Sequence, residues 1–113
     1  MTPQTLIEQL NNNSESLVFS DVIAAIDANY EYTPQTFKNG EVENAAGTNE
    51  GSCKVFAFAQ LNDLSQEQTL TCFAEHYRSV LATPEGNDHG NIRNFMETGW
   101  DGINFTGVAL QAK

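Results

Sequence analysis

The sequence predicts a single α+β domain, in which four to five helices surround a buried central segment and a small antiparallel sheet completes the core. Three observations lead to this prediction. Residues 51–61 are apolar in nearly every direction, a helical period of apolar residues precedes them, and an Asn-Gly pair lies between two short strand-like runs. A chain of 113 residues has the length of one domain with one core.

The central segment, residues 51–61, has the sequence GSCKVFAFAQL. In a helix its apolar side chains would point to all sides and leave no solvated face, so we expect it to be buried. Phe56 and Phe58 also fit a strand, because a short apolar run cannot be assigned from periodicity alone. We favour the helix, since Ser52 is a good N-cap and the two alanines and Leu61 favour helical structure.

Two helices are predicted before the central segment. Thr2 and Pro3 match an N-cap followed by a first-turn proline, and residues 11–14 end the short helix that they open. We expect Pro34 to stop the second helix by about Tyr32, because the residue before a proline avoids the α region. This second helix has its apolar residues at the helical period, namely Phe19, Val22, Ile23, Ile26 and Tyr30.

A hairpin is predicted at residues 37–43, FKNGEVE, because Asn39-Gly40 readily takes the positive φ angles of a type I′ turn. Residues 45–51 are rich in Gly, Asn and Thr and should form the loop that leads into the central segment.

Two helices are predicted after the central segment. Ser65 and Gln68 have the spacing of a capping box, and Asp88 can cap a later helix that ends at Gly99. Residues 100–108 should be irregular or extended, with a hairpin about Thr106-Gly107. The first of these helices should bury Leu70, Phe73, Ala74, Tyr77 and Leu81, and the second Ile92, Phe95 and Met96.

The composition excludes several classes of protein. The chain has 15 acidic and 5 basic residues, a formal net charge of −10. This charge repels phosphate backbones and anionic lipids, so we expect neither nucleic acid nor membrane as a partner, whereas a basic protein remains compatible. No apolar run is long enough to span a membrane, and the N-terminus does not resemble a cleaved signal peptide. Cys53 and Cys72 are therefore expected to be reduced thiols.

Several stretches of the chain resemble the HopJ type III effector family, and together they extend from about residue 19 to residue 113. The stretches are residues 26–30 (IDANY), 37–40 (FKNG), 51–59 (GSCKVFAFA), 64–69 (LSQEQT) and 88–100 (DHGNIRNFMETGW). The resemblance implies one HopJ-like domain over residues 1–113, with residues 1–13 a helix or leader and residues 14–113 the core. It implies delivery into host cells by a type III secretion system, but no catalytic residue, cofactor or substrate.

A cysteine nucleophile is the first candidate site. At the start of a helix, the thiolate of Cys53 would be stabilised by unpaired N–H groups, and Lys54 would add to this effect. His89 or His76 could serve as the base, oriented by Asp88 or Asn91. Burial of Cys53 beside the most apolar stretch is the competing interpretation, and it is favoured because no further local motif supports catalysis.

Cys72 and His76 are four residues apart, a spacing that suits a metal site, but both fall opposite the apolar face and are expected to face solvent. We therefore predict no metal and no cofactor. The most varied polar cluster lies later in the chain and supplies candidate binding residues. Arg93 there could hold a carboxylate or phosphate, but we favour the simpler interpretation, in which Asp88 caps the helix and Arg93 forms an ion pair with a nearby acid. The candidates are Asp88, His89, Asn91, Arg93, Trp100 and Asp101.

These observations favour a small acidic protein that binds another protein, unidentified and of basic character, without catalysis. The alternative is a thiol-dependent enzyme centred on Cys53. Residues 1–20 are polar and lack Lys and Arg, as uncleaved type III secretion signals do, but a docked helix explains the same residues. We expect residence in the bacterial cytoplasm, with type III secretion into a host cell as the alternative.

Overall fold

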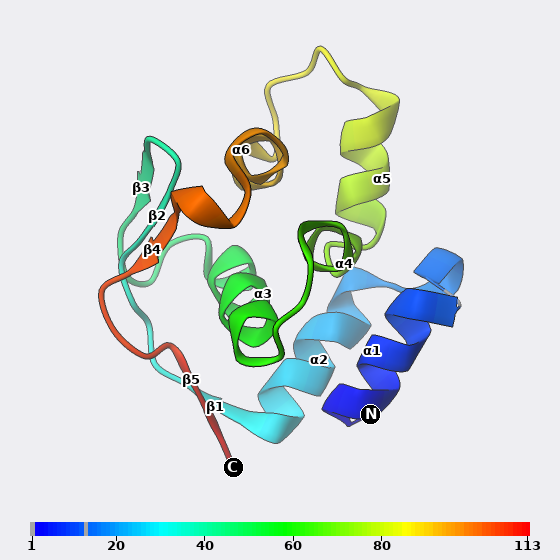
Figure 1. Ribbon diagram of the computed structural model, residues 1–113, viewed down its shortest axis with the longest axis vertical. Coiled ribbons are helices and arrows are strands. Elements are labelled where there is room, and N and C mark those ends of the chain that lie inside the picture. The colour runs from blue at the N-terminus through cyan, green and yellow to red at the C-terminus, as the bar shows by residue number, and fades with distance from the viewer. Residues whose placement is uncertain (1, 13) are drawn as a thin grey trace.

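The computed structural model describes residues 2–12 and 14–113 as an α+β domain, which confirms the predicted fold class (Figure 1). The predicted end of the first helix at residues 11–14 includes Asn13, which lies outside the described residues. The helices are α1 (Pro3–Asn12), η1 (Ser14–Ser16), α2 (Phe19–Asn29), α3 (Glu50–Leu61), α4 (Gln66–Thr71), α5 (Glu75–Ala82), α6 (Gly90–Thr98) and η2 (Gly99–Gly102). The strands are β1 (Tyr30–Tyr32), β2 (Phe37–Asn39), β3 (Val42–Asn44), β4 (Ile103–Phe105) and β5 (Leu110–Ala112).

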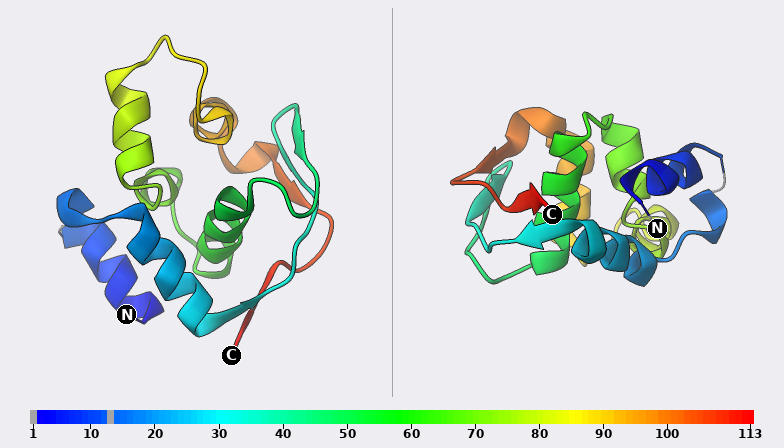
Figure 2. Two further views of the ribbon diagram at one scale, coloured as in Figure 1. Left: turned by 180° about the vertical axis from the view of Figure 1, so that it is seen from behind. Right: turned by 90° about the horizontal axis from the view of Figure 1, so that it is seen from below.

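Helix α3 is the central segment, and the helical prediction for it is confirmed. The strands β2, β3 and β4 lie on one side of it and α1 and α2 on the other (Figures 1 and 2). Its buried residues are Cys53, Val55, Phe56, Ala57, Phe58 and Ala59. Two details of the prediction were wrong. The helix begins at Glu50 after Asn49, one turn before the expected cap at Ser52, and Leu61 is 54% exposed because it ends the last turn.

Phe56 holds the core together through four aromatic neighbours from separate elements. Its ring centroid lies 5.9 Å from that of Phe37, 5.5 Å from Phe73, 5.0 Å from Phe95 and 6.4 Å from Trp100. Most of these rings meet edge to face or tilted, which are favourable aromatic geometries. The sheet, α6 and the segment between α4 and α5 therefore depend on one side chain of α3.

The helix predicted after Ser65 is divided in two. The capping box is confirmed, because the Ser65 side chain accepts from the Gln68 N–H while the Gln68 side chain accepts from the Ser65 N–H. The chain then breaks at Ala74, whose φ of 54° is left-handed, and α5 continues in a new direction. Because of this break, Cys72 lies in the core and Leu81 is 53% exposed. The prediction of one continuous helix had placed Cys72 in solvent and Leu81 in the core, and both placements are wrong.

The second predicted helix is shorter than expected. It ends at Asn29, and Tyr30–Tyr32 forms β1, which pairs antiparallel with β5 in the register Glu31↔Gln111. Aromatic residues favour extended structure, and the C-terminal segment supplies the partner that a local pattern cannot reveal. The expected hairpin about Thr106-Gly107 is also wrong, because β4 pairs with β2 and β5 pairs with β1.

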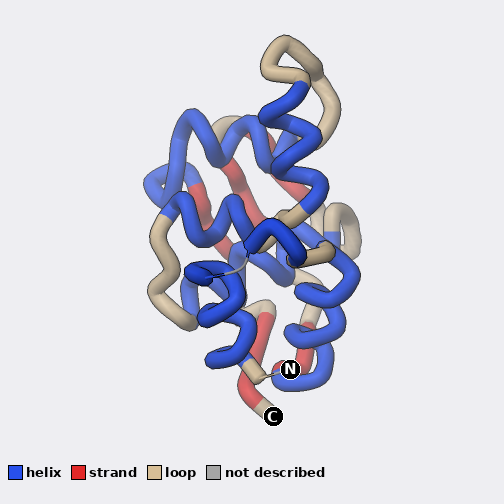
Figure 3. The backbone as a smooth tube through the Cα atoms, turned by 90° about the vertical axis from the view of Figure 1, so that its right-hand side faces the viewer, coloured by secondary structure: helices blue, strands red, loops and turns tan. Residues whose placement is uncertain are grey.

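The hairpin of β2 and β3 is confirmed with its turn shifted by one residue. Asn39 pairs with Val42, so the two turn residues are Gly40 and Glu41, with Gly40 at φ 63°. Glycine in the first turn position is typical of a type II′ turn. The helices lie in front of the resulting sheet, of order β3-β2-β4, in Figure 3. None of the helices in the described part of the chain has the length and apolar character needed to cross a bilayer.

We predict that Phe56→Ala lowers the free energy of unfolding by about 3–5 kcal/mol, because it removes a buried ring that four others contact. Urea denaturation measures this change. Val108→Ala is the control: Val108 is 60% exposed, and its truncation should alter stability by no more than about 0.5 kcal/mol. A loss of less than about 1 kcal/mol for Phe56→Ala would contradict the central role of this ring.

Candidate functional site

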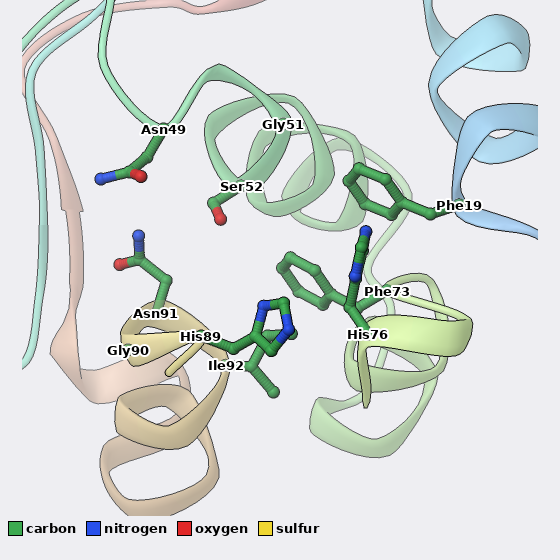
Figure 4. Close-up of a pocket in the computed structure, with 10 residues that line it drawn as sticks. All are labelled: Phe19, Asn49, Gly51, Ser52, Phe73, His76, His89, Gly90, Asn91 and Ile92. Carbon is green, nitrogen blue, oxygen red and sulfur yellow. The ribbon is translucent and has the colours of Figure 1, made fainter. Parts of the chain in front are cut away.

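A pocket of about 240 Å³ lies where α3 and α6 begin, beside Phe19 at the start of α2 and the first turn of α5 (Figure 4). The N-termini of these four helices lie close together because α2 packs against α3 and α5 packs against α6. Of the sequence candidates, His76, His89 and Asn91 line this pocket, whereas Cys53 does not. In the described chain, none of the residues that line it is acidic.

The two histidines, which the sequence offered as alternative bases, lie together in this pocket. The ring centroids of His76 and His89 are 5.0 Å apart, and the His76 ring meets Phe19 edge to face at 4.8 Å. The side chain of His89 is 32% exposed, so the pair opens to solvent. His76 was expected to face solvent on a continuous helix, and the break at Ala74 instead turns it towards α6.

The helix beginnings at the pocket lack side-chain caps. Asn49 precedes α3 and His89 precedes α6, both in the left-handed conformation, and neither side chain caps the helix that follows. The predicted cap, Asp88, lies one residue too early for α6. The hydroxyl of Ser52 points into the space between the two helices (Figure 4). Unpaired N–H groups in a first helical turn favour negative charge nearby.

The start of α2 illustrates that preference within this protein. The Phe19 N–H donates to Oε1 of Glu75 at 2.6 Å, so a carboxylate from α5 caps α2. This hydrogen bond lowers the pKa of Glu75 below its ordinary value. The N-termini of α3 and α6 face the same pocket, and neither N-cap residue makes a side-chain cap, although Glu50 lies in the first turn of α3.

Arg93 forms hydrogen bonds with the loop that leads into α6. Its guanidinium donates to the carbonyl oxygens of Thr83, at 2.8 Å, and of Asp88, at 2.6 Å, and pairs with Oδ1 of Asp88 at 2.7 Å. The hydrogen bond from Arg93 lowers the pKa of the Asp88 carboxyl. Asp88 and Arg93 thus support residues 83–89: the expected ion pair of Arg93 is present, whereas the expected helix cap by Asp88 is not.

Asn91 connects the pocket to the sheet. Its Oδ1 accepts from the side-chain amides of Asn39, at 3.0 Å, and Asn44, at 3.1 Å, and its own amide donates to Asn44. Asn49 donates to the same Asn44 oxygen at 2.6 Å. Asn39 and Asn44 are buried, so the bonds made by their side-chain amides and by the Asn44 oxygen avoid the free-energy cost of unpaired polar groups, whereas Oδ1 of Asn39 accepts no hydrogen bond. The network fixes α6 relative to the start of α3.

Trp100 and Asp101 lie away from the pocket. The Trp100 indole N–H donates to the Leu64 carbonyl at 3.1 Å, and its ring packs on Phe56 and Phe95. Trp100 therefore completes the core, while Asp101 is exposed in η2.

Cys53 lies in the core beneath the start of α3, with 1% of its surface exposed. Burial raises the pKa of this thiol, in the opposite direction to the effect expected from the helix start. Its Sγ is 4.0 Å from the Gln35 carbonyl. Lys54, expected to stabilise the thiolate, pairs instead with Asp27 at 2.9 Å and lies over the Tyr32 ring.

Cys72 is fully buried, and burial raises its pKa to about 12. The expectation that it faces solvent beside His76 is therefore wrong. Among the described residues, no group of three or more His, Cys, Asp and Glu side chains is arranged to hold a metal ion.

Sequence reasoning found the two histidines but missed the other walls of the pocket. Phe19 and Phe73 were assigned to the apolar faces of helices, and Ser52 was assigned as a cap. The left-handed residues that aim α3 and α6 at the pocket are Asn49 and His89, and neither is a glycine that would signal this backbone.

Comparisons with known proteins agree with the fold. A family model described as HopJ type III effector protein matches residues 3–110. A crystal structure of an unknown function protein, VPA0580, is 50% identical to this chain with a TM-score of 0.94, and the match covers 97% of this chain and 92% of that one. No curated protein matches the chain. These likenesses support the fold and assign no reaction.

We predict that both thiols resist modification in the folded protein. A raised pKa means that less thiolate is present at neutral pH than in an unfolded chain, and burial blocks the reagent. A chromogenic disulfide reagent should react with two thiols rapidly in denaturant and slowly without it. The Cys72→Ala variant isolates Cys53, and its rapid reaction below the ordinary thiol pKa of about 8.5 would contradict this expectation.

Proposed function

Because this chain belongs to the HopJ type III effector family, we propose that it acts by binding another protein and carries out no catalysis of its own. The observation that supports this most strongly is the way the basic side chains are used. Three of the five bind within the chain, so carboxylates greatly outnumber the remaining exposed cations. A surface with a large excess of one charge is suited to recognising a partner of the opposite charge.

The three basic side chains that bind within the chain each connect different parts of the structure. Lys54 pairs with Asp27, and Arg93 pairs with Asp88 and the loop carbonyls. Arg78 donates to the Leu17 carbonyl at 3.1 Å and so attaches α5 to the start of α2. Lys38 and Lys113 are the two other basic residues, both exposed, among 15 acidic ones. We therefore propose a basic protein as the partner, because nucleic acid and anionic lipid would be repelled.

The thiol-dependent enzyme is the alternative to this proposal. The burial and raised pKa of Cys53 favour the binding role, because a nucleophilic thiol needs access and a stabilised thiolate. His76 and His89 line a pocket that Cys53 does not reach.

The family description associates the chain with type III secretion, and we propose that the folded protein resides in the bacterial cytoplasm. Helix α1 carries the support for this proposal. Leu6 is fully buried and Leu10 is 7% exposed, so the helix is docked on the core. A leader that must thread unfolded through a secretion apparatus gains from weak docking instead. Secretion into a host cell remains the alternative.

We predict that full-length protein captures a basic protein from bacterial or host lysate, and that the capture weakens when salt is raised, because salt screens exposed charges. Mass spectrometry identifies the captured protein and its charge. Three paired variants that neutralise exposed acids locate the contact: Glu8→Gln with Glu15→Gln, Glu41→Gln with Glu43→Gln, and Glu85→Gln with Glu97→Gln.

One pair should weaken capture at least about tenfold while the other two serve as matched controls. A partner that is acidic, or that binds equally at high salt, would show the charge argument to be wrong.

We further predict that residues 1–20, fused to a passenger protein, do not direct its export through a functional type III system. Immunoblotting of culture supernatant and cell pellet measures the export. An established type III signal on the same passenger is the positive control, and export by residues 1–20 alone would overturn the cytoplasmic assignment.

A further inference from the structure

The pocket between His76 and His89 has an apolar wall. Phe19 and Phe73 stack with their ring centroids 6.0 Å apart and their planes 7° apart, and both line the pocket with Ile92. The His76 ring meets the edge of Phe19, so an aromatic surface continues to the imidazoles. Such a wall accommodates a flat or apolar group and offers it no hydrogen bond.

The opposite wall is polar and includes hydrogen-bond donors. It contains the Ser52 hydroxyl and the Asn49 side chain, together with the first turns of α3 and α6 (Figure 4). Both helices exceed eight residues and both lack a side-chain cap. The two imidazoles add N–H donors.

The charge of the lining differs from that of the whole protein. None of the described residues around the pocket is a carboxylate, although the chain has 15. The nearest acidic groups lie just outside the lining: Glu50 is in the first turn of α3, Glu75 accepts from the Phe19 N–H, and Asp88 pairs with Arg93 at 2.7 Å while its other oxygen is 3.9 Å from Nε2 of His89. The residues that line the pocket therefore offer a negative ligand hydrogen-bond donors and imidazoles and no carboxylate.

We propose that this pocket binds a small molecule in which an oxyanion, a phosphate or a carboxylate, is attached to an apolar group. The oxyanion lies between His76 and His89 and accepts from Ser52 and the first turns of the two helices. The apolar group lies against Phe19, Phe73 and Ile92. A volume of about 240 Å³ is below the usual range for drug-sized ligands, so the molecule is small.

Solution NMR with the full chain tests this proposal directly. Phenyl phosphate and benzoate carry the two kinds of oxyanion on the same ring, and phenol carries none. Titration of either anion at a fixed, mildly acidic pH should shift the amide resonances of Gly51, Ser52, Gly90 and Asn91 saturably. Phenol should bind at least about tenfold more weakly, because it cannot make charge-assisted hydrogen bonds. The tighter of the two anions identifies the class of ligand.

Variants separate this site from general charge attraction. The double variant His76→Gln, His89→Asn should weaken the anion at least about tenfold, and asparagine suits position 89 because it tolerates the left-handed backbone. Ser52→Ala should weaken it less. Lys38→Gln removes an exposed cation of β2 and should leave affinity unchanged. Thermal unfolding confirms that each variant is folded.

Three results would overturn the proposal. The first is the absence of saturable shifts with both anions. The second is equal affinity for phenol and the anions, which would indicate apolar binding alone. The third is an affinity that the double histidine variant leaves unchanged or that Lys38→Gln reduces equally, since the anion would then respond to surface charge.

Discussion

Burial of α3 is the constraint on which the rest of this structure depends. A helix with apolar side chains on all sides is stable only if other elements cover each of them, and in a chain of this length nearly every element is needed. Phe56 alone draws in Phe37, Phe73, Phe95 and Trp100. Helices α2 and α4 and strand β5 pack directly on α3, whereas α1 covers α2 and α4, and α5 packs on α6.

The same constraint places the pocket. The elements that cover α3 must enter and leave around its first turn, and there α2, α5 and α6 also begin. The left-handed residues Asn49, Ala74 and His89 turn the chain sharply at these points, a conformation that costs free energy for residues other than glycine. Burial of α3 and the asparagine network around Asn91 offset that cost. The strained turns and the uncapped helix N-termini therefore lie together around the pocket.

The sequence predicted correctly those elements that depend on residues close together in the chain. The buried α3 follows from side chains within one stretch, the Ser65 cap from two residues three apart, and the hairpin from Gly40. Strand β1, Tyr30–Tyr32, pairs with a partner about 80 residues away at the end of the chain. Local periodicity does not reveal that partner, and the predicted second helix therefore continued past its true end. No glycine or proline in the sequence indicates the turn at Ala74. Because the turn was not predicted, Cys72 and His76 were expected in solvent and Leu81 in the core, and all three expectations are wrong.

The arrangement of charge is compatible with both of the proposed kinds of recognition, that of a basic protein and that of a small anion. Lys54, Arg78 and Arg93 are engaged with the chain itself, which stabilises the fold and leaves carboxylates over the exterior. The pocket instead relies on neutral groups, namely backbone N–H donors, a hydroxyl and imidazoles, whose attraction for an anion acts over a short range. Long-range attraction of a basic protein and short-range binding of a small anion can therefore coexist, because salt screens the first far more than the second.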